Sequence, residues 1–551
     1  MALNPGKKGN PQKTVPASNA EINRTSSKAP RTSKRMSSIN QVNNARASST
    51  NNARLSTRVN LDTGASGDVD HEEKVEEEEE KVPDVELIVD GFGFMPGHGK
   101  RRHSRMGEEA SIESPCASST NVDIVRRYTW RTRNRMLVQL ISYGATFTTI
   151  RVPDKKGIPE DVIAGFDTLE EYFQRQNPYF GATIGRYANY ICEGTMVVRP
   201  SGRLYMLSQN KHHHHYNGGY IGFDKVNWRS YVSGNKVIMS HVSERFSEGY
   251  PGTVLVQSCF EVTCDNTIKI EMKCTTSEPT IINLSICPYF NLAGHQAGNE
   301  EMLDHIITIN GDKFTPTADD GLPTGEKKVV GGTAYDFRVP RMLKVMMPKI
   351  PMGGYDLNYC ITKGVEQELT FHARAVHART GRVVEVYSNQ PGMQFYTGNN
   401  LPDPDKIVEL LPGEEDEMGE AWEVKEEEMV EAAEASEAAE PVMTRAPSQA
   451  AEAAKATAAE SKSSTSEEES ELLSERSVAG ESSEGSRGVG YVPLYGKGNA
   501  LYIRHGFFCF MPQNYPDAVN HKNFPNSVLN PGEVYVHKIE YKFGLLLGKF
   551  V

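Results

Sequence analysis

The stretch YPGTVLVQSCFEVTCDNTIKIEMKCTT, residues 250–276, decides the fold class. Apolar and polar residues alternate in each half, β-branched residues are common, and Asp and Asn separate the two halves. Alternation with a period of two on either side of a turn signal is typical of paired antiparallel strands. Residues 136–157 and 304–316 continue the pattern. The sequence therefore predicts an all-β protein, built as a large antiparallel β-sandwich.

Helical patterns are scarce by comparison. The one convincing stretch is FDTLEEYFQRQ, residues 166–176, for which Asp167 is the expected N-terminal cap. Strands over about 300 residues with almost no helices favour a sandwich over a parallel α/β sheet.

Two segments differ from this strand-rich sequence. Residues 1–84 are rich in Asn, Ser, Lys and Arg: residues 1–60 hold eleven Lys or Arg against one acid, and an acidic run follows at 76–80. Residues 414–487 hold 22 acids against six bases, within Ala, Ser and Glu repeats. Neither composition can bury enough apolar surface to offset the entropy of ordering. We therefore expect a disordered tail and a disordered acidic insertion, the latter interrupting one β-sandwich domain that spans residues 85–551.

Composition excludes several classes of protein. No apolar run reaches the ~18 residues that a membrane-spanning helix needs, and the start MALNPGKKGN lacks the apolar core of a secretory signal. The eight cysteines include no CxxC pair, which favours reduced thiols in a cytoplasmic protein and predicts no metal site and no cofactor. Nucleic-acid binding by the basic tail is a weaker interpretation than solvated disorder. Protein partners of the charged segments stay open, and so does the oligomeric state.

Six segments resemble the aldose 1-epimerase family, the galactose mutarotases, in the family's order. They are NPYFGATIGRYANYI (177–191), YNGGYIGFDKVNW (216–228), INLSICPYFNLAG (282–294), GGYDLNY (353–359), NQPGMQFYTGN (389–399) and QNYPDAVNHKNFPNSVLNPGEVY (513–535). The resemblance implies a large antiparallel β-sandwich, in agreement with the periodicity, and an activity that interconverts the anomers of a hexose.

Mutarotation requires two titratable groups. A base takes the proton of the anomeric hydroxyl while an acid protonates the ring oxygen, so the ring opens and can close on its other face. The resemblance implies a glutamate as the base, a histidine as the acid and a second histidine near the ring. It also implies Arg, Asp and Gln side chains that hold the sugar hydroxyls.

The residues that hold the sugar are matched in this chain. The resemblance assigns substrate binding to Arg186 in GRYANY, Asp356 in GYDLN and Gln394 in QFYTGN, with Asn189 as a support.

The proton-transfer positions are not matched. Asn217 stands where the family has the histidine of Leu-His-Gly-Gly, Cys287 where it has the presumed acid, and Met511 where it has the presumed base. An amide has no useful pKa, a thiol on an apolar strand is a poor acid at neutral pH, and a thioether has no proton to give. Loss of a general acid or base costs ~10²- to 10⁴-fold each.

The sequence therefore favours a hexose-binding protein of this family with impaired or absent catalysis. Two alternatives stay open. One is an active aldose 1-epimerase that uses an imidazole of the run His212 to His215, because histidine titrates near neutral pH. A solvent-exposed loop is the simpler interpretation of that run. The other is an interaction protein that acts through its charged segments.

Overall fold

The computed structural model describes residues 83–96, 123–174, 177–198, 202–350, 353–364, 368–407 and 491–546. All of them belong to one unit, Glu80–Val551. The expected disordered tail, up to residue 82, and the expected insertion 414–487 lie outside the described residues, so both stay predictions.

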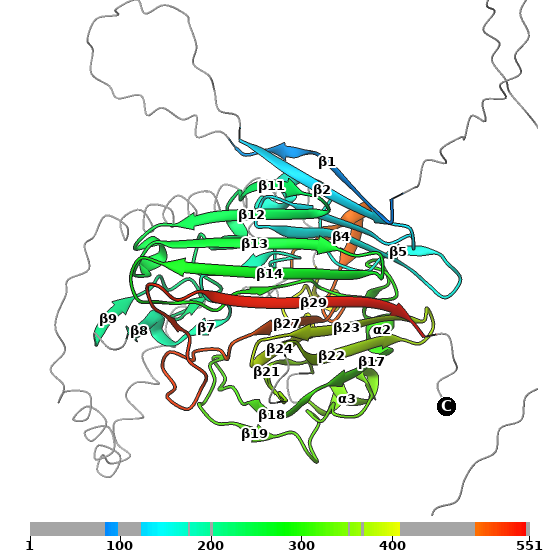
Figure 1. Cartoon of the computed structure of the whole chain (residues 1–551). Helices are drawn as coiled ribbons and strands as arrows, with labels where there is room; N and C mark the ends of the chain where they lie inside the picture. The colour runs from blue at the N-terminus through cyan, green and yellow to red at the C-terminus, as the bar shows by residue number, and fades with distance from the viewer. Residues whose placement is uncertain are drawn as a thin grey trace, which may run out of the picture. The chain divides into compact units, whose positions relative to one another are not determined.

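The larger layer is a nine-stranded antiparallel sheet (Figure 1). Its order is β11 (Arg229–Ser233), β12 (Lys236–Ser243), β13 (Val254–Val262), β14 (Thr267–Thr276), β29 (Tyr535–Leu545), β23 (Arg382–Ser388), β22 (Thr370–His377), β17 (His305–Ile309) and β20 (Arg341–Met342). The decisive stretch forms β13 and β14, which pair antiparallel as the alternation predicts. The last strand of the chain, β29, lies between β14 and β23 and so completes the middle of the sheet.

Two five-stranded sheets form the opposing layer. The first has the order β1 (Val85–Phe94), β2 (Ile124–Thr132), β3 (Leu137–Ile141), β4 (Thr146–Pro153) and β5 (Pro159–Asp161). The second has the order β19 (Lys328–Val329), β18 (Gly311–Thr315), β21 (Asp356–Ile361), β24 (Gly392–Tyr396) and β27 (Cys509–Gln513).

The layers meet in one continuous apolar core. Phe147 of β4 packs edge-on against Phe260 of β13, with ring centres 5.7 Å apart. Tyr541 of β29 is buried and donates a hydrogen bond to the Phe510 carbonyl of β27 at 3.2 Å. Because burial of one aromatic side chain stabilises a protein by about 1.5–3 kcal/mol, such contacts hold the layers together. The prediction of a large antiparallel β-sandwich is confirmed.

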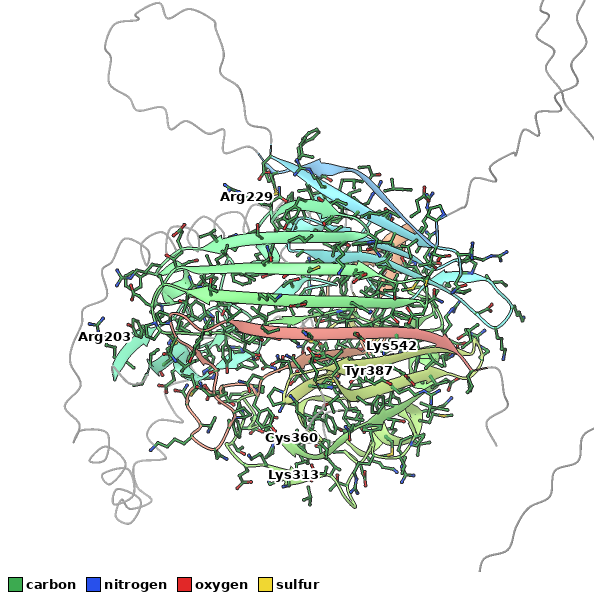
Figure 2. All side chains as sticks on the ribbon, viewed as in Figure 1. Arg203, Arg229, Lys313, Cys360, Tyr387 and Lys542 are labelled. Atoms are coloured by element: carbon green, nitrogen blue, oxygen red, sulfur yellow. The ribbon has the colours of Figure 1, made fainter. Side chains whose placement is uncertain are left out.

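The opposite face of the large sheet is polar. Lys542 lies 4.5 Å from the ring centre of Tyr387 on the neighbouring strand (Figure 2). The ion pair of Lys236 with Glu261 joins β12 to β13 in the same manner. This face is therefore a solvated one, as the alternation along the strands requires.

Short strand pairs form the rest of the sheet structure. They are β6 (Thr183–Ile184) with β16 (Ser285–Ile286), β7 (Tyr190–Ile191) with β10 (His215–Tyr216), β8 (Thr195–Val198) with β9 (Arg203–Met206), β15 (Thr280–Ile281) with β28 (Val528–Leu529), and β25 (Leu494–Gly496) with β26 (Ala500–Tyr502).

Helices are short. They are α1 (Leu169–Phe173), α2 (Gly298–Leu303) and α3 (Leu343–Met346), with 3₁₀ turns at η1 (Cys192–Gly194), η2 (Phe223–Lys225), η3 (Ser247–Gly249), η4 (Met347–Lys349), η5 (Pro404–Lys406) and η6 (Lys497–Asn499). The predicted helix is thus α1, but its N-cap is Thr168 and not Asp167. The Asp167 carboxylate instead accepts the backbone N–H of Gly498 at 2.6 Å, which links α1 to η6.

The two residues that flank the longest internal gap, Ile407 and Tyr491, lie side by side. Ile407 and Tyr491 form a parallel bridge, and the Tyr491 N–H donates to the Lys406 carbonyl at 2.8 Å. Six residues further on, buried Lys497 donates to the Asp161 carboxylate at 2.7 Å. The returning chain is therefore fixed to the first five-stranded sheet before it enters β27.

Two further expectations concern the described residues alone. None of their helices combines the length and the apolar character that a membrane crossing demands. Their seven cysteines are all free thiols, as expected, and Cys116 lies outside the described residues.

Candidate functional site

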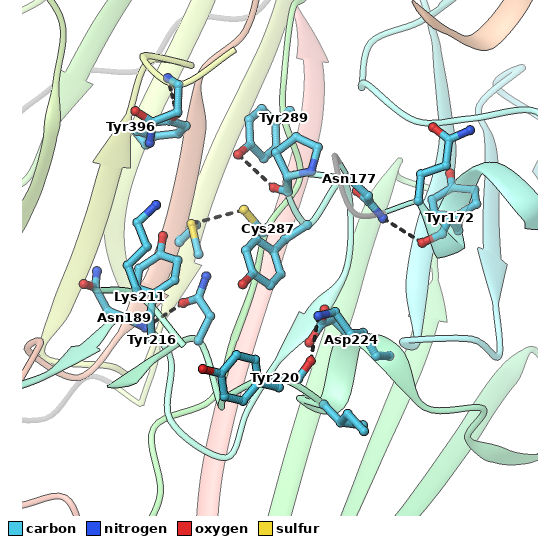
Figure 3. Close-up of a pocket in the computed structure, with 18 of the residues that line it drawn as sticks. Tyr172, Asn177, Asn189, Lys211, Tyr216, Tyr220, Asp224, Cys287, Tyr289 and Tyr396 are labelled. Carbon is cyan, nitrogen blue, oxygen red and sulfur yellow. Dashed lines mark hydrogen bonds between the residues drawn. The ribbon is translucent and has the colours of Figure 1, made fainter. Parts of the chain in front are cut away.

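A pocket of about 620 Å³ opens beside the second five-stranded sheet and the strand pair β7–β10 (Figure 3). Its lining is polar and aromatic: Met95, Pro96, Tyr143, Tyr172, Phe173, Gln174, Asn177, Pro178, Tyr179, Asn189, Tyr190, Lys211, Tyr216, Asn217, Tyr220, Ile221, Asp224, Lys225, Cys287, Tyr289, Gly321, Asp356, Gln394, Tyr396, Asn400 and Met511. Such a volume and lining are typical of small-molecule sites.

Adjacent strands bring three of the predicted site positions together. Asp356 begins β21, Gln394 lies in β24 and Met511 in β27, and these strands are neighbours in the sheet. Gln394 pairs in register with Met511, and its amide donates to the Asp356 carboxylate at 2.7 Å. The other amide atom, Gln394 Oε1, is buried without a hydrogen-bond partner among the described residues.

Asn189 and Asn217 meet in the lining of the same pocket. Asn217 Oδ1 accepts the backbone N–H of Asn189 at 2.8 Å, and the adjacent tyrosines pair in strands β7 and β10. Both asparagines have positive φ, 73° and 49°, a conformation that Asn tolerates better than most residues. Gly218 follows with a φ of 90°, and a Cβ there would lie 1.9 Å from the Gly185 carbonyl oxygen. A glycine is therefore required for the two loops to approach this closely.

Two carboxyl groups line the pocket. The Asp356 side chain is accessible from the pocket, yet surrounding protein removes enough water to raise the pKa of its carboxyl to about 6. Burial likewise raises the pKa of Asp224, in η2, to about 6. Lys211 supplies a positive charge to the same pocket, with its Nζ 5.7 Å from the ring centre of Tyr216.

Sulfur forms the floor of the pocket. Cys287, which directly follows β16, donates its thiol hydrogen to the thioether of Met511 with 3.4 Å between the two sulfur atoms. Both residues are nearly buried, at 5% and 7% exposure, and belong to an apolar cluster that also contains Cys509. Burial raises the pKa of the Cys509 thiol well above its ordinary value. The floor is therefore apolar in character.

The expected position of Arg186 differs from the structure. Its side chain is buried at 2% exposure and does not line the pocket. The guanidinium donates to the Ser243 hydroxyl and to four backbone carbonyls of residues 243–252, at 2.5–3.1 Å. All five of its N–H groups are used in this way. Arg186 therefore joins two loops in this structure. Its guanidinium has no N–H group left to donate to a ligand, because all five are bonded to residues 243–252.

The histidine run is divided between core and surface. His215 is fully buried, with its ring bonded to the Ser208 carbonyl at 2.7 Å and the Tyr250 hydroxyl at 2.5 Å. His214 accepts the Glu193 N–H, while His212 and His213 are exposed. No histidine is among the residues that line the pocket. The described region also contains no group of His, Cys, Asp and Glu arranged to hold a metal ion.

The sequence did not predict the tyrosine side chains that line the pocket. Six of the tyrosines that line the pocket come from the same segments that carry the resemblance: Tyr179, Tyr190, Tyr216, Tyr220, Tyr289 and Tyr396. Their density in those segments was the available signal. Phe223 and Trp228, from the segment 216–228, lie in the core, with ring centres 5.7 Å apart.

Comparisons with known proteins agree on one family. The family model described as aldose 1-epimerase matches residues 126–443. Galactose mutarotase from Homo sapiens is 34% identical over 408 residues, which cover 74% of this chain and 91% of the human protein. Aldose 1-epimerase from Haemophilus influenzae is 32% identical over 278 residues, 50% of this chain and 78% of that protein.

Solved structures share the fold. The GalM/aldose epimerase homologue from C. elegans aligns with a TM-score of 0.54 at 20% identity, covering 75% of this chain and 97% of that one. Galactose 1-epimerase from Lactobacillus acidophilus aligns with a TM-score of 0.53 at 16% identity, covering 84% and 99%.

Proposed function

The chain belongs to the aldose 1-epimerase family, and from that premise we propose that it binds a hexose in this pocket with little or no catalysis of mutarotation. The observation that carries the proposal is the sulfur pair of Cys287 and Met511, 3.4 Å apart, at the positions that the resemblance assigns to the acid and the base.

Polar side chains support the binding half of the proposal. Asp356 and Gln394 are joined by a hydrogen bond and face the pocket beside Asn189. The Asp356 carboxylate, which is accessible from the pocket, accepts hydrogen bonds from sugar hydroxyls. Tyrosine rings around them offer apolar faces to the C–H surface of a sugar.

The chemistry of the floor supports the catalytic half. The thioether of Met511 has no ionisable proton, and the thiol of Cys287 donates its hydrogen to that sulfur atom. Asn217 offers an amide whose oxygen is already bonded to the Asn189 backbone. With both proton carriers replaced, at ~10²- to 10⁴-fold each, the rate falls close to that of the uncatalysed reaction.

A second candidate function is a working epimerase with other proton carriers. The favouring observation is the pair of carboxyls, Asp224 and Asp356, whose pKa values of about 6 suit general acid or base catalysis near neutral pH. The histidine run gives this candidate no support, since none of its members lines the pocket.

Polarimetry with fresh α-galactose and α-glucose, together with calorimetric titration of the same sugars, tests the proposal. We expect heat of binding from at least one sugar and an equilibration rate close to the buffer control. A rate far above buffer that Asp224→Asn abolishes would replace the proposal with the second candidate. Absence of binding together with absence of catalysis would reject both.

A further inference from the structure

We propose that the pocket is built for a hexose that carries an apolar group on its anomeric oxygen, an aryl or alkyl glycoside, in preference to the free sugar. This inference rests on the proposed function, because it uses the same polar side chains to hold the sugar ring. It adds the chemical class of the ligand.

The first argument is size. A hexose, with its dozen non-hydrogen atoms, occupies on the order of 200 Å³ at the packing density of protein interiors. The pocket encloses about 620 Å³. The remainder is enough space for an aglycone as large as the sugar.

The second argument is the division of the lining into two ends. Lys211, Asn189 and Tyr216 lie on one side of Cys287, and Asn177 and Tyr172 lie on the other (Figure 3). The Asp356 carboxyl interacts electrostatically with Lys211 and Tyr216, so the Asp356–Gln394 pair belongs to the first end. The second end continues into the apolar side chains of Phe173, which packs against Tyr143, and of Pro178, which follows Asn177. The carboxyl of Asp224 lies on this side of Cys287 as well (Figure 3). One ligand that fills both ends must therefore be polar at one end and apolar at the other.

The side-chain polar atoms of Asn177, Tyr172 and Tyr289 are already bonded within the protein. The Asn177 amide donates to the Tyr172 carbonyl at 3.3 Å and accepts the Phe180 N–H at 3.1 Å. The Tyr172 hydroxyl accepts the Phe166 N–H at 3.1 Å, and the Tyr289 hydroxyl donates to the Pro178 carbonyl at 2.9 Å. These bonds leave ring faces and aliphatic edges as the surface offered to a ligand.

The third argument concerns the junction between the two ends, where the sulfur floor lies. The resemblance puts the anomeric centre of a bound sugar beside Cys287 and Met511. A free anomeric hydroxyl there would lose water and gain no good partner, since thiol and thioether groups bond weakly. A glycosidic oxygen has no hydrogen to satisfy, and its substituent would continue into the apolar end. The floor therefore favours the glycoside.

The test is calorimetric titration of the full chain with four probes: galactose, glucose, phenyl galactoside and phenyl glucoside. We expect one phenyl glycoside to bind at least about tenfold more tightly than its parent sugar, which corresponds to ~1.4 kcal/mol. Phe173→Ala, which removes a ring that packs against Tyr143 at 4.9 Å, should reduce this ratio to below threefold. Leu255→Ala, on the outer face of β13 and 50% exposed, is the control and should keep the ratio.

A second variant guards against loss of folding in the first. Ile221 lines the pocket and is 48% exposed, so Ile221→Asn should fold and also lower the ratio. If a free sugar binds as tightly as its phenyl glycoside, the inference is overturned while the proposed function stands. If none of the four probes binds, both are overturned. A ratio that neither Phe173→Ala nor Ile221→Asn reduces would likewise overturn the assignment of the apolar end.

Discussion

The sulfur atoms of Cys287 and Met511 are in direct contact, 3.4 Å apart, across the junction between the segment after β16 and strand β27. Two groups in contact leave no space between them for a sugar ring. A proton carrier at either position would have to extend beyond this floor into the pocket. The replacement of both residues therefore changes the shape of the site as well as its acid–base chemistry.

Restoring the two ionisable groups should restore some activity. We expect the double variant Cys287→His, Met511→Glu to equilibrate α-galactose at least about tenfold faster than the parent chain, since each proton carrier contributes ~10²- to 10⁴-fold and part of this is lost to imperfect geometry. Polarimetry measures the rate. The matched control, Cys287→His with Met511→Gln, has the same shape without the carboxyl and should be slower than the first double variant, because it keeps only one of the two proton carriers. Equal rates for the two double variants would contradict the assignment of Met511 to the position of the base.

Local sequence patterns were sufficient to predict the fold class and individual strands. The alternation in residues 250–276 predicts β13 and β14 because each strand buries one face against the core and exposes the other to water. The position of β29 between β14 and β23 was not predictable, because strand order depends on contacts between residues far apart in sequence.

The candidate site was predictable where its residues lie on neighbouring strands, and unpredictable where it depends on contacts between residues far apart in sequence. Asp356 and Gln394 lie in strands that pair, so their motifs and their geometry agree. Arg186 shows the limit, because its motif is compatible with a ligand-facing or a buried guanidinium. The outcome depends on carbonyls of residues 243–252, which surround it after folding.

Sugar binding should depend on the ionisation of Asp356. Its carboxyl has a pKa of about 6, so at pH 5 roughly a tenth of it is ionised, and an acceptor for sugar hydroxyls is lost. We expect the affinity for galactose, measured by calorimetry, to fall severalfold to about tenfold between pH 7.5 and pH 5. Asp356→Asn should bind weakly at both pH values. Asp224→Asn removes the other carboxyl of raised pKa and should keep the pH dependence; if Asp224→Asn abolishes it instead, the effect belongs to Asp224.

Buried histidines should make the fold sensitive to mild acid. Burial lowers the pKa of His215, His241, His295 and His372 to about 4 and of His305 and His537 to about 3. Between pH 6.5 and pH 4 the unfolded chain therefore binds more protons than the folded one, and the free energy of unfolding falls as the pH falls. Asp224 and Asp356 act in the opposite direction between pH 6 and pH 4, since their folded pKa values are raised. The two carboxyls offset only part of the effect of the six histidines.

Chemical denaturation at pH 7 and pH 5 measures this effect. We expect a loss of several kcal/mol, given ~1.4 kcal/mol per pKa unit for each group. His537→Gln should reduce the dependence by about one histidine's share, because the His537 ring is fully buried with its Nε2 unpartnered. His213→Gln, at an exposed position, should leave it unchanged. Equal stability at the two pH values would show that these rings ionise as freely in the folded chain as in water.

Arg186 should matter for stability more than for the ligand. Arg186→Ala leaves the Ser243 hydroxyl and four carbonyls of residues 243–252 without their donor, and each buried acceptor left unpaired costs about 1–3 kcal/mol. We expect a loss of at least about 3 kcal/mol in the free energy of unfolding, measured by urea denaturation. Arg186→Lys should recover a minority of it, because an ammonium cannot reproduce the planar fork of five donors. Arg229→Ala, at an exposed arginine on β11 (Figure 2), is the control and should change stability by less than about 0.5 kcal/mol.

If Arg186 held the sugar directly, Arg186→Ala would weaken galactose binding while the unfolding transition stayed where it is. That result would show that the guanidinium of Arg186 binds the ligand and does not serve mainly to join the loops.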